Sequence, residues 1–219
     1  MKNRIRLCSI IALAAIIGFS FIGCGSDNGG ISGLNLSGPV FYFDQSQPNT
    51  TPQPYTGPVV PIRSLGSAGG SGEIRNGNFS FTIDVPTTTV QLSVGGSFMS
   101  ARFEITQVSA PVLFYRLTFE EITAPFDKAH WLYWGNDLEG GSYEMVDPMY
   151  VSADVTVSGI GRTATFGTNV LRGSDFTLNL KEGWNMVIRT RLPQADGSLT
   201  ESLRFGEPTS SFTWRLETN

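Results

Sequence analysis

The segment HWLYWGNDLEGGSYEM, residues 130–145, carries the side chains of this chain that are best suited to contact another molecule. If the segment is extended, Trp131 and Tyr133 lie on one side of it, because successive side chains of a strand alternate. Leu132 and Trp134 then lie on the other side. Such residues more often fill a core, but an exposed pair beside polar neighbours suits a sugar ring or a protein interface. Trp131, Tyr133 and Trp134 are therefore the candidate ligand-binding residues.

Groups that could catalyse a reaction are few. His130 is the only histidine, so a Ser-His-Asp triad would have to use it, and no G-x-S-x-G motif is present. A surface or capping histidine is the favoured interpretation. Paired carboxylates could hydrolyse glycosidic bonds, and the local clusters are Glu120 with Glu121, Asp137 with Glu139, and Glu144 with Asp147. Adjacent acids on a strand point to opposite faces, so we predict no catalytic residue and keep a polysaccharide hydrolase as an alternative.

The chain is predicted to bind no metal or organic cofactor. Zinc needs several nitrogen or sulfur ligands, and one histidine cannot supply them. The glycine-rich stretch LGSAGGSGE, residues 65–73, lacks the Gly-Lys-Ser/Thr ending of a phosphate loop. Asp137, Glu139 and Asp147 could hold calcium through oxygen atoms. Their spacing does not match an EF-hand loop, and a polar hairpin loop is the favoured interpretation.

A hydrophobic pattern of period two must position these residues. It predicts half-buried antiparallel strands, and many such strands separated by turns indicate an all-β sandwich, Ig-like or jelly-roll-like. One domain is expected over residues 36–219, with residues 36–75 irregular and rich in proline and glycine. The outward faces carry charged residues, which argues against an outer-membrane barrel. The alternating segments are FSFTIDV (79–85), TVQLSV (89–94), MSARFEIT (99–106), YRLTFEE (115–121), VSADVTVS (151–158), FTLNL (176–180), WNMVI (184–188), LTESLRF (199–205) and FTWRL (212–216).

The first 23 residues have the pattern of a signal peptide. Three cations among the first six residues precede an uncharged apolar run over residues 7–23. The junction Phe21-Ile22-Gly23-Cys24 resembles the lipobox of bacterial lipoproteins: Gly23 and Cys24 match it, whereas Phe21 stands where leucine is usual. The resemblance implies cleavage between Gly23 and Cys24 and acylation of Cys24, for example with palmitate. A plain signal peptide with an incidental cysteine is the alternative.

Lipid on Cys24 would anchor the chain to a membrane through a flexible linker, residues 24–35. In lipoproteins of this kind Gly25 after the cysteine favours the outer membrane, so the expected location is the bacterial cell envelope. The formal charge of −4 becomes −7 when the signal peptide's Lys2, Arg4 and Arg6 are removed (−4 − 3). An acidic chain without basic clusters argues against nucleic acid as a partner.

A second resemblance covers roughly residues 149–192. The segments MYVSADVTVSG and FTLNLKEGWNMVI are similar to the C-terminal part of uncharacterised bacterial lipoproteins, in which an LKxGWN turn follows a strand. Here the turn is Leu180 to Asn185, and Gly183 can take positive φ before Trp184 starts the next strand. This similarity implies a β-rich extracytoplasmic domain and no known activity.

Three functional hypotheses follow from these observations. The favoured one is a lipid-anchored envelope lipoprotein whose non-catalytic β-domain binds a glycan or a protein, or gives the envelope structure. The second is a secreted-type polysaccharide hydrolase that uses paired carboxylates. The third is a structural or fibre-forming surface subunit, in which exposed strand edges would pair between chains.

Overall fold

The computed structural model describes residues 33–43, 52–65, 69–100, 102–122, 125–126, 129–138, 142–167 and 169–218. The predicted signal peptide, Cys24 and most of the predicted linker lie outside these residues. The described part is all-β, as predicted, and contains no helix that is long and apolar enough to cross a membrane. Its strands are β1 (Leu34–Phe43), β2 (Gln53–Pro54), β3 (Val60–Arg63), β4 (Ser71–Arg75), β5 (Asn78–Ile83), β6 (Val90–Gln91), β7 (Phe103–Val108), β8 (Leu113–Arg116), β9 (His130–Asp137), β10 (Tyr143–Val151), β11 (Val155–Gly161), β12 (Thr163–Phe166), β13 (Asn169–Gly173), β14 (Phe176–Leu180), β15 (Gly183–Pro193), β16 (Leu199–Phe205) and β17 (Thr213–Thr218).

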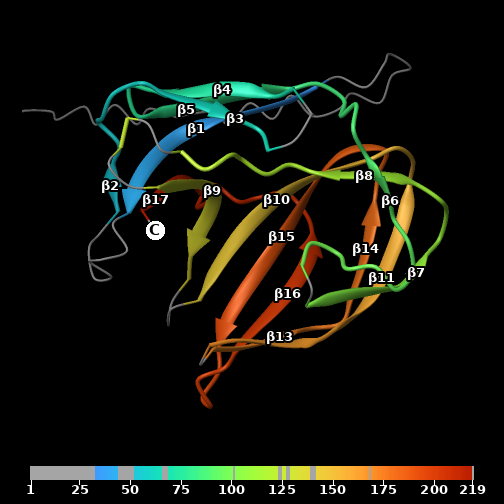
Figure 1. Cartoon of the computed structure of the whole chain (residues 1–219). Coiled ribbons are helices and arrows are strands. Elements are labelled where there is room, and N and C mark those ends of the chain that lie inside the picture. Colours follow the sequence, from blue (N-terminus) through green and yellow to red (C-terminus); the bar gives the residue numbers. More distant parts are fainter. Residues whose placement is uncertain are drawn as a thin grey trace, which may run out of the picture.

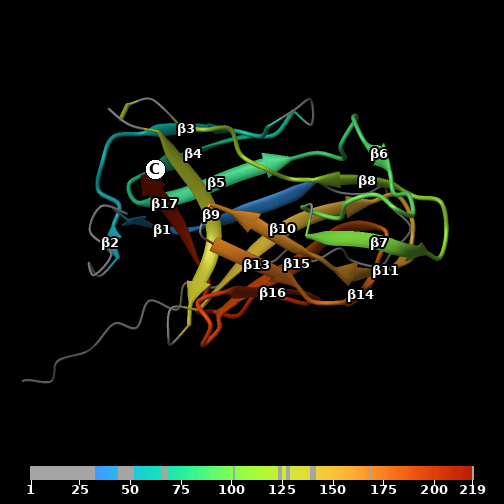
Figure 2. The ribbon, with the colours of Figure 1, turned by 60° about the horizontal axis from the view of Figure 1, so that its bottom comes forward.

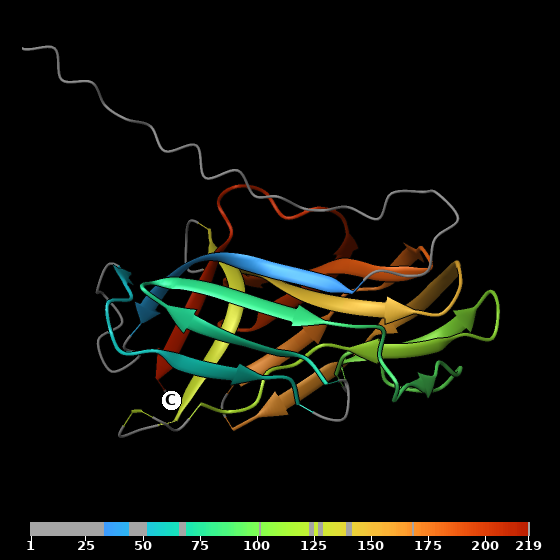
Figure 3. The same ribbon diagram turned by 90° about the horizontal axis from the view of Figure 1, so that it is seen from above.

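The strands form one large sheet and one small sheet. The main path of the large sheet runs β12-β13-β16-β15-β10-β9-β17-β1-β5-β4-β3, and the small sheet runs β14-β11-β7. Figures 1 and 3 show β1, β5, β4 and β3, the N-terminal layer, lying across the strands β17, β9, β10, β15 and β16, the central sheet. Figure 2 shows β7, β11 and β14, the small sheet, together at one end of the central sheet.

Both faces of the central sheet are buried, each against a different layer. In β15, Met186 and Ile188 belong to one hydrophobic cluster while Val187 between them belongs to another, as the alternation of a strand requires. The first core lies between the central sheet and the N-terminal layer and includes Leu36, Phe79, Phe81, Leu132, Trp134, Val146, Phe212, Trp214 and Leu216. The second core lies between the central sheet and the small sheet and includes Phe103, Ile105, Met149, Val151, Val157, Phe176, Leu178, Val187 and Leu203.

The structure corrects the expectation of a wholly antiparallel arrangement. β1 pairs in parallel with β17, and β13 pairs in parallel with β16. A parallel pair needs a long connection between its strands, and these strands are not joined by a hairpin. The first strand of the domain therefore enters the sheet between β5 and the last strand, β17, where alternation along the sequence could not reveal its direction.

Several predicted boundaries are also wrong. The region 36–75 is predicted to be irregular, but its described residues hold most of β1 and all of β2 to β4. The proline-containing β3 is an edge strand, where a missing backbone donor is tolerated. The segment 151–158 is not one strand: β10 ends at Val151, a turn follows, and β11 begins at Val155. The alternation continues through that turn because Val151 before it and Val155 after it both pack in the second core. Strand β6 covers only Val90 and Gln91 of the predicted 89–94.

The turn at residues 181–183 connects two sheets rather than two strands of a hairpin. β14 pairs with β11, whereas β15 pairs with β10 and β16. Gly183 has a φ of 96°, the positive value that its position in the turn predicted. The Asn185 side chain closes the turn, because its Oδ1 accepts from the Lys181 backbone at 2.8 Å and its Nδ2 donates to the Lys181 carbonyl at 2.7 Å.

Candidate functional site

A pocket opens where two strands leave the same edge of β10. Along residues 143–146 this edge pairs with β9, and along residues 149–151 it pairs with β8. Beyond Leu117, whose backbone N–H donates to the Pro148 carbonyl, the chain turns away to pair with the residues that follow β3. It returns only at Ile122, which forms a bridge with His130. The pocket therefore occupies a gap in the sheet between β9 and the segment 116–119.

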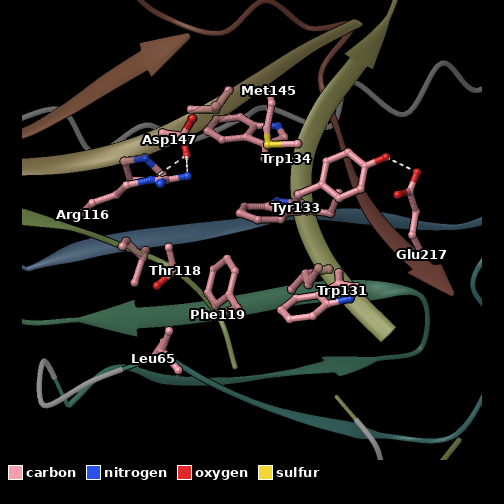
Figure 4. A pocket seen from close by; sticks show the side chains of 15 residues that line it. Leu65, Arg116, Thr118, Phe119, Trp131, Tyr133, Trp134, Met145, Asp147 and Glu217 are labelled. Atoms are coloured by element: carbon pink, nitrogen blue, oxygen red, sulfur yellow. Dashed lines mark hydrogen bonds and ion pairs between the residues drawn. The ribbon is translucent and has the colours of Figure 1, made fainter. Parts of the chain in front are cut away.

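The pocket has a volume of about 410 Å³, within the range of small-molecule sites. Its lining comes from five parts of the fold, and Figure 4 shows the labelled side chains gathered around it. The wall is mostly aromatic and aliphatic, with a polar group at each of two sides. The lining residues that carry the argument below are Arg116, Phe119, Trp131, Tyr133, Asp147 and Glu217.

The aromatic segment alternates as predicted. Leu132 and Trp134 are buried in the first core, whereas Trp131 is 44% exposed and Tyr133 is half-buried. Trp134 still reaches the pocket wall, although only 4% of it is exposed and its ring stacks on Trp214 at 5.4 Å between centroids. The three candidate residues thus line one pocket, but Trp131 is the exposed ring and Trp134 is part of the core.

An ion-paired group stands on one side of the pocket. Asp147 Oδ1 accepts from Arg116 Nε at 2.9 Å and from Nη2 at 2.5 Å. Its Oδ2 lies 3.4 Å from Arg189 Nε. The remaining Arg116 nitrogen, Nη1, donates to the Met99 carbonyl at 2.9 Å. Asp147 is 4% exposed, and burying a carboxylate costs free energy unless it has partners of this kind.

A tyrosine and a carboxylate stand on the other side. The Tyr133 hydroxyl donates to Glu217 Oε1 in a short hydrogen bond. Burial, followed by the negative charge of Glu217, raises the pKa of Tyr133 well above its ordinary value of 10. Tyr133 is therefore a protonated donor at neutral pH, and Glu217 is held in place by it at the pocket rim (Figure 4).

The other residues considered for chemistry are not gathered into a site. Glu120 and Glu121 are both exposed, Glu144 pairs with Arg204, and Asp137 pairs with Arg215 at 2.6 Å. Glu139, one of the three acids considered for calcium, lies outside the described residues. Over the described ranges, no three histidine, cysteine, aspartate or glutamate side chains are grouped so that they could hold a metal ion.

The favoured interpretation of His130 is a surface or capping histidine, and its burial shows that it is not a surface residue. It is 2% exposed and its ring stacks on Phe126 at 3.9 Å between centroids. The first two residues of β9 therefore differ in their environment: His130 packs inward, and Trp131 lines the pocket.

The sequence did not single out Phe119, Arg116 or Glu217 as pocket residues. Arg116 and Phe119 stand in the alternating segment 115–121, and Glu217 directly follows the segment 212–216, but alternation does not show which of these segments lies beside β9. The signal that could have found Glu217 is its register, because it stands directly opposite Trp131 in the β17–β9 pair. That register follows from burying Trp214 and Leu216 on the opposite face.

Comparison of the chain with protein-family models, with curated proteins and with solved structures finds no match.

Proposed function

We propose that this chain is a lipid-anchored protein of the bacterial cell envelope whose β-domain binds a ligand in the pocket between β8, β9 and β10 without catalysing a reaction. The observation that carries the proposal is the pocket itself, with the exposed Trp131 at its wall. An exposed tryptophan beside a preformed cavity is a common anchor for a ligand, since it offers a large rigid surface. The Ig-like or jelly-roll-like sandwich is the architecture that we assign to this domain.

The two pocket carboxylates favour binding over hydrolysis. A glycoside hydrolase needs one carboxyl group that gives a proton and another that activates water or attacks the sugar. Asp147 is engaged by Arg116 and Arg189, and Glu217 accepts a hydrogen bond from Tyr133. Groups held in this way serve to shape the pocket. Release of reducing ends from a polysaccharide, lost in Asp147→Asn or Glu217→Gln, would instead support the hydrolase.

The position of the pocket fits a domain tethered at its N-terminal end. β1 begins at Leu34, opposite Ile83, and ends at Phe43, opposite Glu217 of the pocket. Because Phe43 is the last residue of β1, the pocket lies near the end of β1 that is farther from Cys24 along the chain. The two ends of this ten-residue strand are about 30 Å apart. A ligand would then be met on the side of the domain away from the anchor.

The test compares two exposed aromatic residues. Full-length protein is applied to arrays of glycans and matrix proteins as the wild type, as Trp131→Ala and as Phe205→Ala, because Phe205 is 46% exposed and lies outside the pocket. We expect binding that is lost in Trp131→Ala and kept in Phe205→Ala. Binding that survives Trp131→Ala would place the ligand elsewhere and refute the proposal.

The anchor has its own test. Intact mass of the membrane-extracted chain should show loss of residues 1–23 and added acyl mass on Cys24. Protease added to intact cells then decides which side of the outer membrane the domain faces. A Cys24→Ala protein that is cleaved yet equally membrane-bound contradicts lipid anchoring.

A further inference from the structure

We propose that the pocket binds an uncharged sugar ring of a glycan, stacked on Trp131. This inference rests on the proposed function, since it names the ligand class of the same pocket. It is carried by a feature separate from the exposed tryptophan: the charged side chains of the pocket wall already have partners within the protein.

Arg116 is the clearest case. All three of its guanidinium nitrogens donate to protein atoms, two to Asp147 and one to the Met99 carbonyl. An acidic sugar would therefore compete with Asp147 for the charge of Arg116, and taking Arg116 away would leave a buried carboxylate short of a partner. Breaking a buried pair in this way is strongly unfavourable. A uronate or a sulfated sugar is thus a poor ligand.

A cationic ligand meets the same difficulty on both sides. Asp147 lies between Arg116 and Arg189, so a cationic group of the ligand that approached Asp147 would be repelled by two guanidinium groups. Glu217 is the other lining carboxylate, and it accepts the Tyr133 hydroxyl. An amino sugar would compete with the Tyr133 hydroxyl for Glu217, whereas a neutral ring competes with neither partner.

The wall nevertheless has polar groups that an acyl chain could not satisfy. Among the strand pairs of the described residues, β9 meets β10 only from Trp134 onward, so its edge at residues 131–133 faces the gap rather than a neighbouring strand. The Thr118 hydroxyl and the Trp131 indole also line the pocket, on the segment 116–119 and on β9 (Figure 4). Covering polar groups with hydrocarbon costs free energy, whereas sugar hydroxyls can hydrogen-bond to them. Sugar rings also present C–H faces that pack on aromatic rings such as Trp131 and Phe119.

Calorimetric titration of the full-length protein tests the inference. The probes are neutral hexasaccharides of β-glucan, mannan and galactan, with hexamers of galacturonate and of glucosamine as the acidic and cationic counterparts. We expect a neutral probe to bind, and its affinity to change by less than about twofold between about 50 mM and about 500 mM NaCl, because no net charge is neutralised. Trp131→Ala should weaken that binding by at least about tenfold, and Phe205→Ala should leave it unchanged.

The outcomes separate this inference from the proposed function. If only a charged hexamer or a matrix protein binds, and Trp131→Ala abolishes that binding, the neutral-sugar inference is wrong and the pocket function stands. Binding of a neutral probe that weakens tenfold with salt also overturns the inference. If a neutral probe binds equally to Trp131→Ala, or if no probe of any class binds, both proposals fail.

Discussion

The two faces of the central sheet are closed in different ways. The face toward the N-terminal layer is closed by large aromatic rings, with Trp134, Trp214 and Phe79 in direct contact. On the face toward the small sheet, two carboxylates are each held between two arginines. Glu201 is fully buried between Arg102 and Arg191, and Asp147 lies between Arg116 and Arg189.

This difference follows from alternation along the same strands. In β17, Trp214 and Leu216 enter the first core while Arg215 between them points the other way. One face is stabilised by the area of its rings, which does not depend on pH. The other depends on ion pairs whose members are costly to bury alone. Stability should therefore respond to different perturbations on the two faces.

The largest expected effect is on the aromatic face. Trp134→Ala should lower the free energy of unfolding by about 4 kcal/mol, because it leaves a cavity against Trp214. The matched change on the same strand, Trp131→Ala, removes an exposed ring and should cost less than about 1 kcal/mol. Chemical denaturation followed by tryptophan fluorescence and circular dichroism measures both. Equal losses would mean that the two sides of β9 do not differ in burial as described.

The next effect concerns the ion-paired face. Glu201→Gln keeps the size of the side chain but leaves Arg102 and Arg191 without a countercharge, and it should cost about 3 kcal/mol. The control is Glu73→Gln, which breaks an exposed pair with Arg75 and should have no measurable effect. Denaturant titration of the two variants decides between them. If Glu201→Gln were as stable as the wild type, the network would contribute nothing to holding the small sheet.

The same carboxylate predicts an acid dependence. Burial acts to raise the pKa of Glu201, but hydrogen bonding and charge from Arg191, together with Arg102, outweigh it and hold the pKa below the ordinary value of 4.5. The unfolded chain then takes up this proton at a higher pH than the folded chain does. The stability that ionised Glu201 contributes is therefore present above about pH 4.5. It is lost as the pH falls through the lower pKa that Glu201 has in the folded state. The free energy of unfolding, measured from about pH 6 downward, should fall more steeply in the wild type than in Glu201→Gln. Parallel curves would contradict this.

The smallest effect is expected at the turn that joins the small sheet to the central sheet. Gly183→Ala forces a side chain into a backbone with φ of 96° and should cost about 1–2 kcal/mol. Gly206→Ala, at a position without positive φ where the new Cβ meets only the end of the Arg204 side chain, should cost less. Thermal unfolding of the two variants makes the comparison. A smaller loss at Gly183 than at Gly206 would show that the turn relaxes without strain.

The sequence by itself determined the all-β class and the inward face of most strands. The reason is local: the period-two alternation in FTLNL or FTWRL does not depend on which strand lies alongside. It also determined that Trp131 and Tyr133 share a side of β9 and that Gly183 takes positive φ. These predictions needed only neighbouring residues and the geometry of the backbone.

Only the tertiary structure decided how the strands pair and what meets at the gap in the sheet. The parallel pairing of β1 with β17, and the departure of β8 and β9 from one edge of β10, join residues far apart in the chain. Arg116 reaches Asp147 through the pairing of β8 with β10, and Glu217 reaches Tyr133 through the pairing of β17 with β9. Alternation assigns a side chain to a face but not to a neighbour, because register is set by the burial of both strands together. The candidate ring was thus visible in the sequence, whereas the pocket around it was a product of the fold.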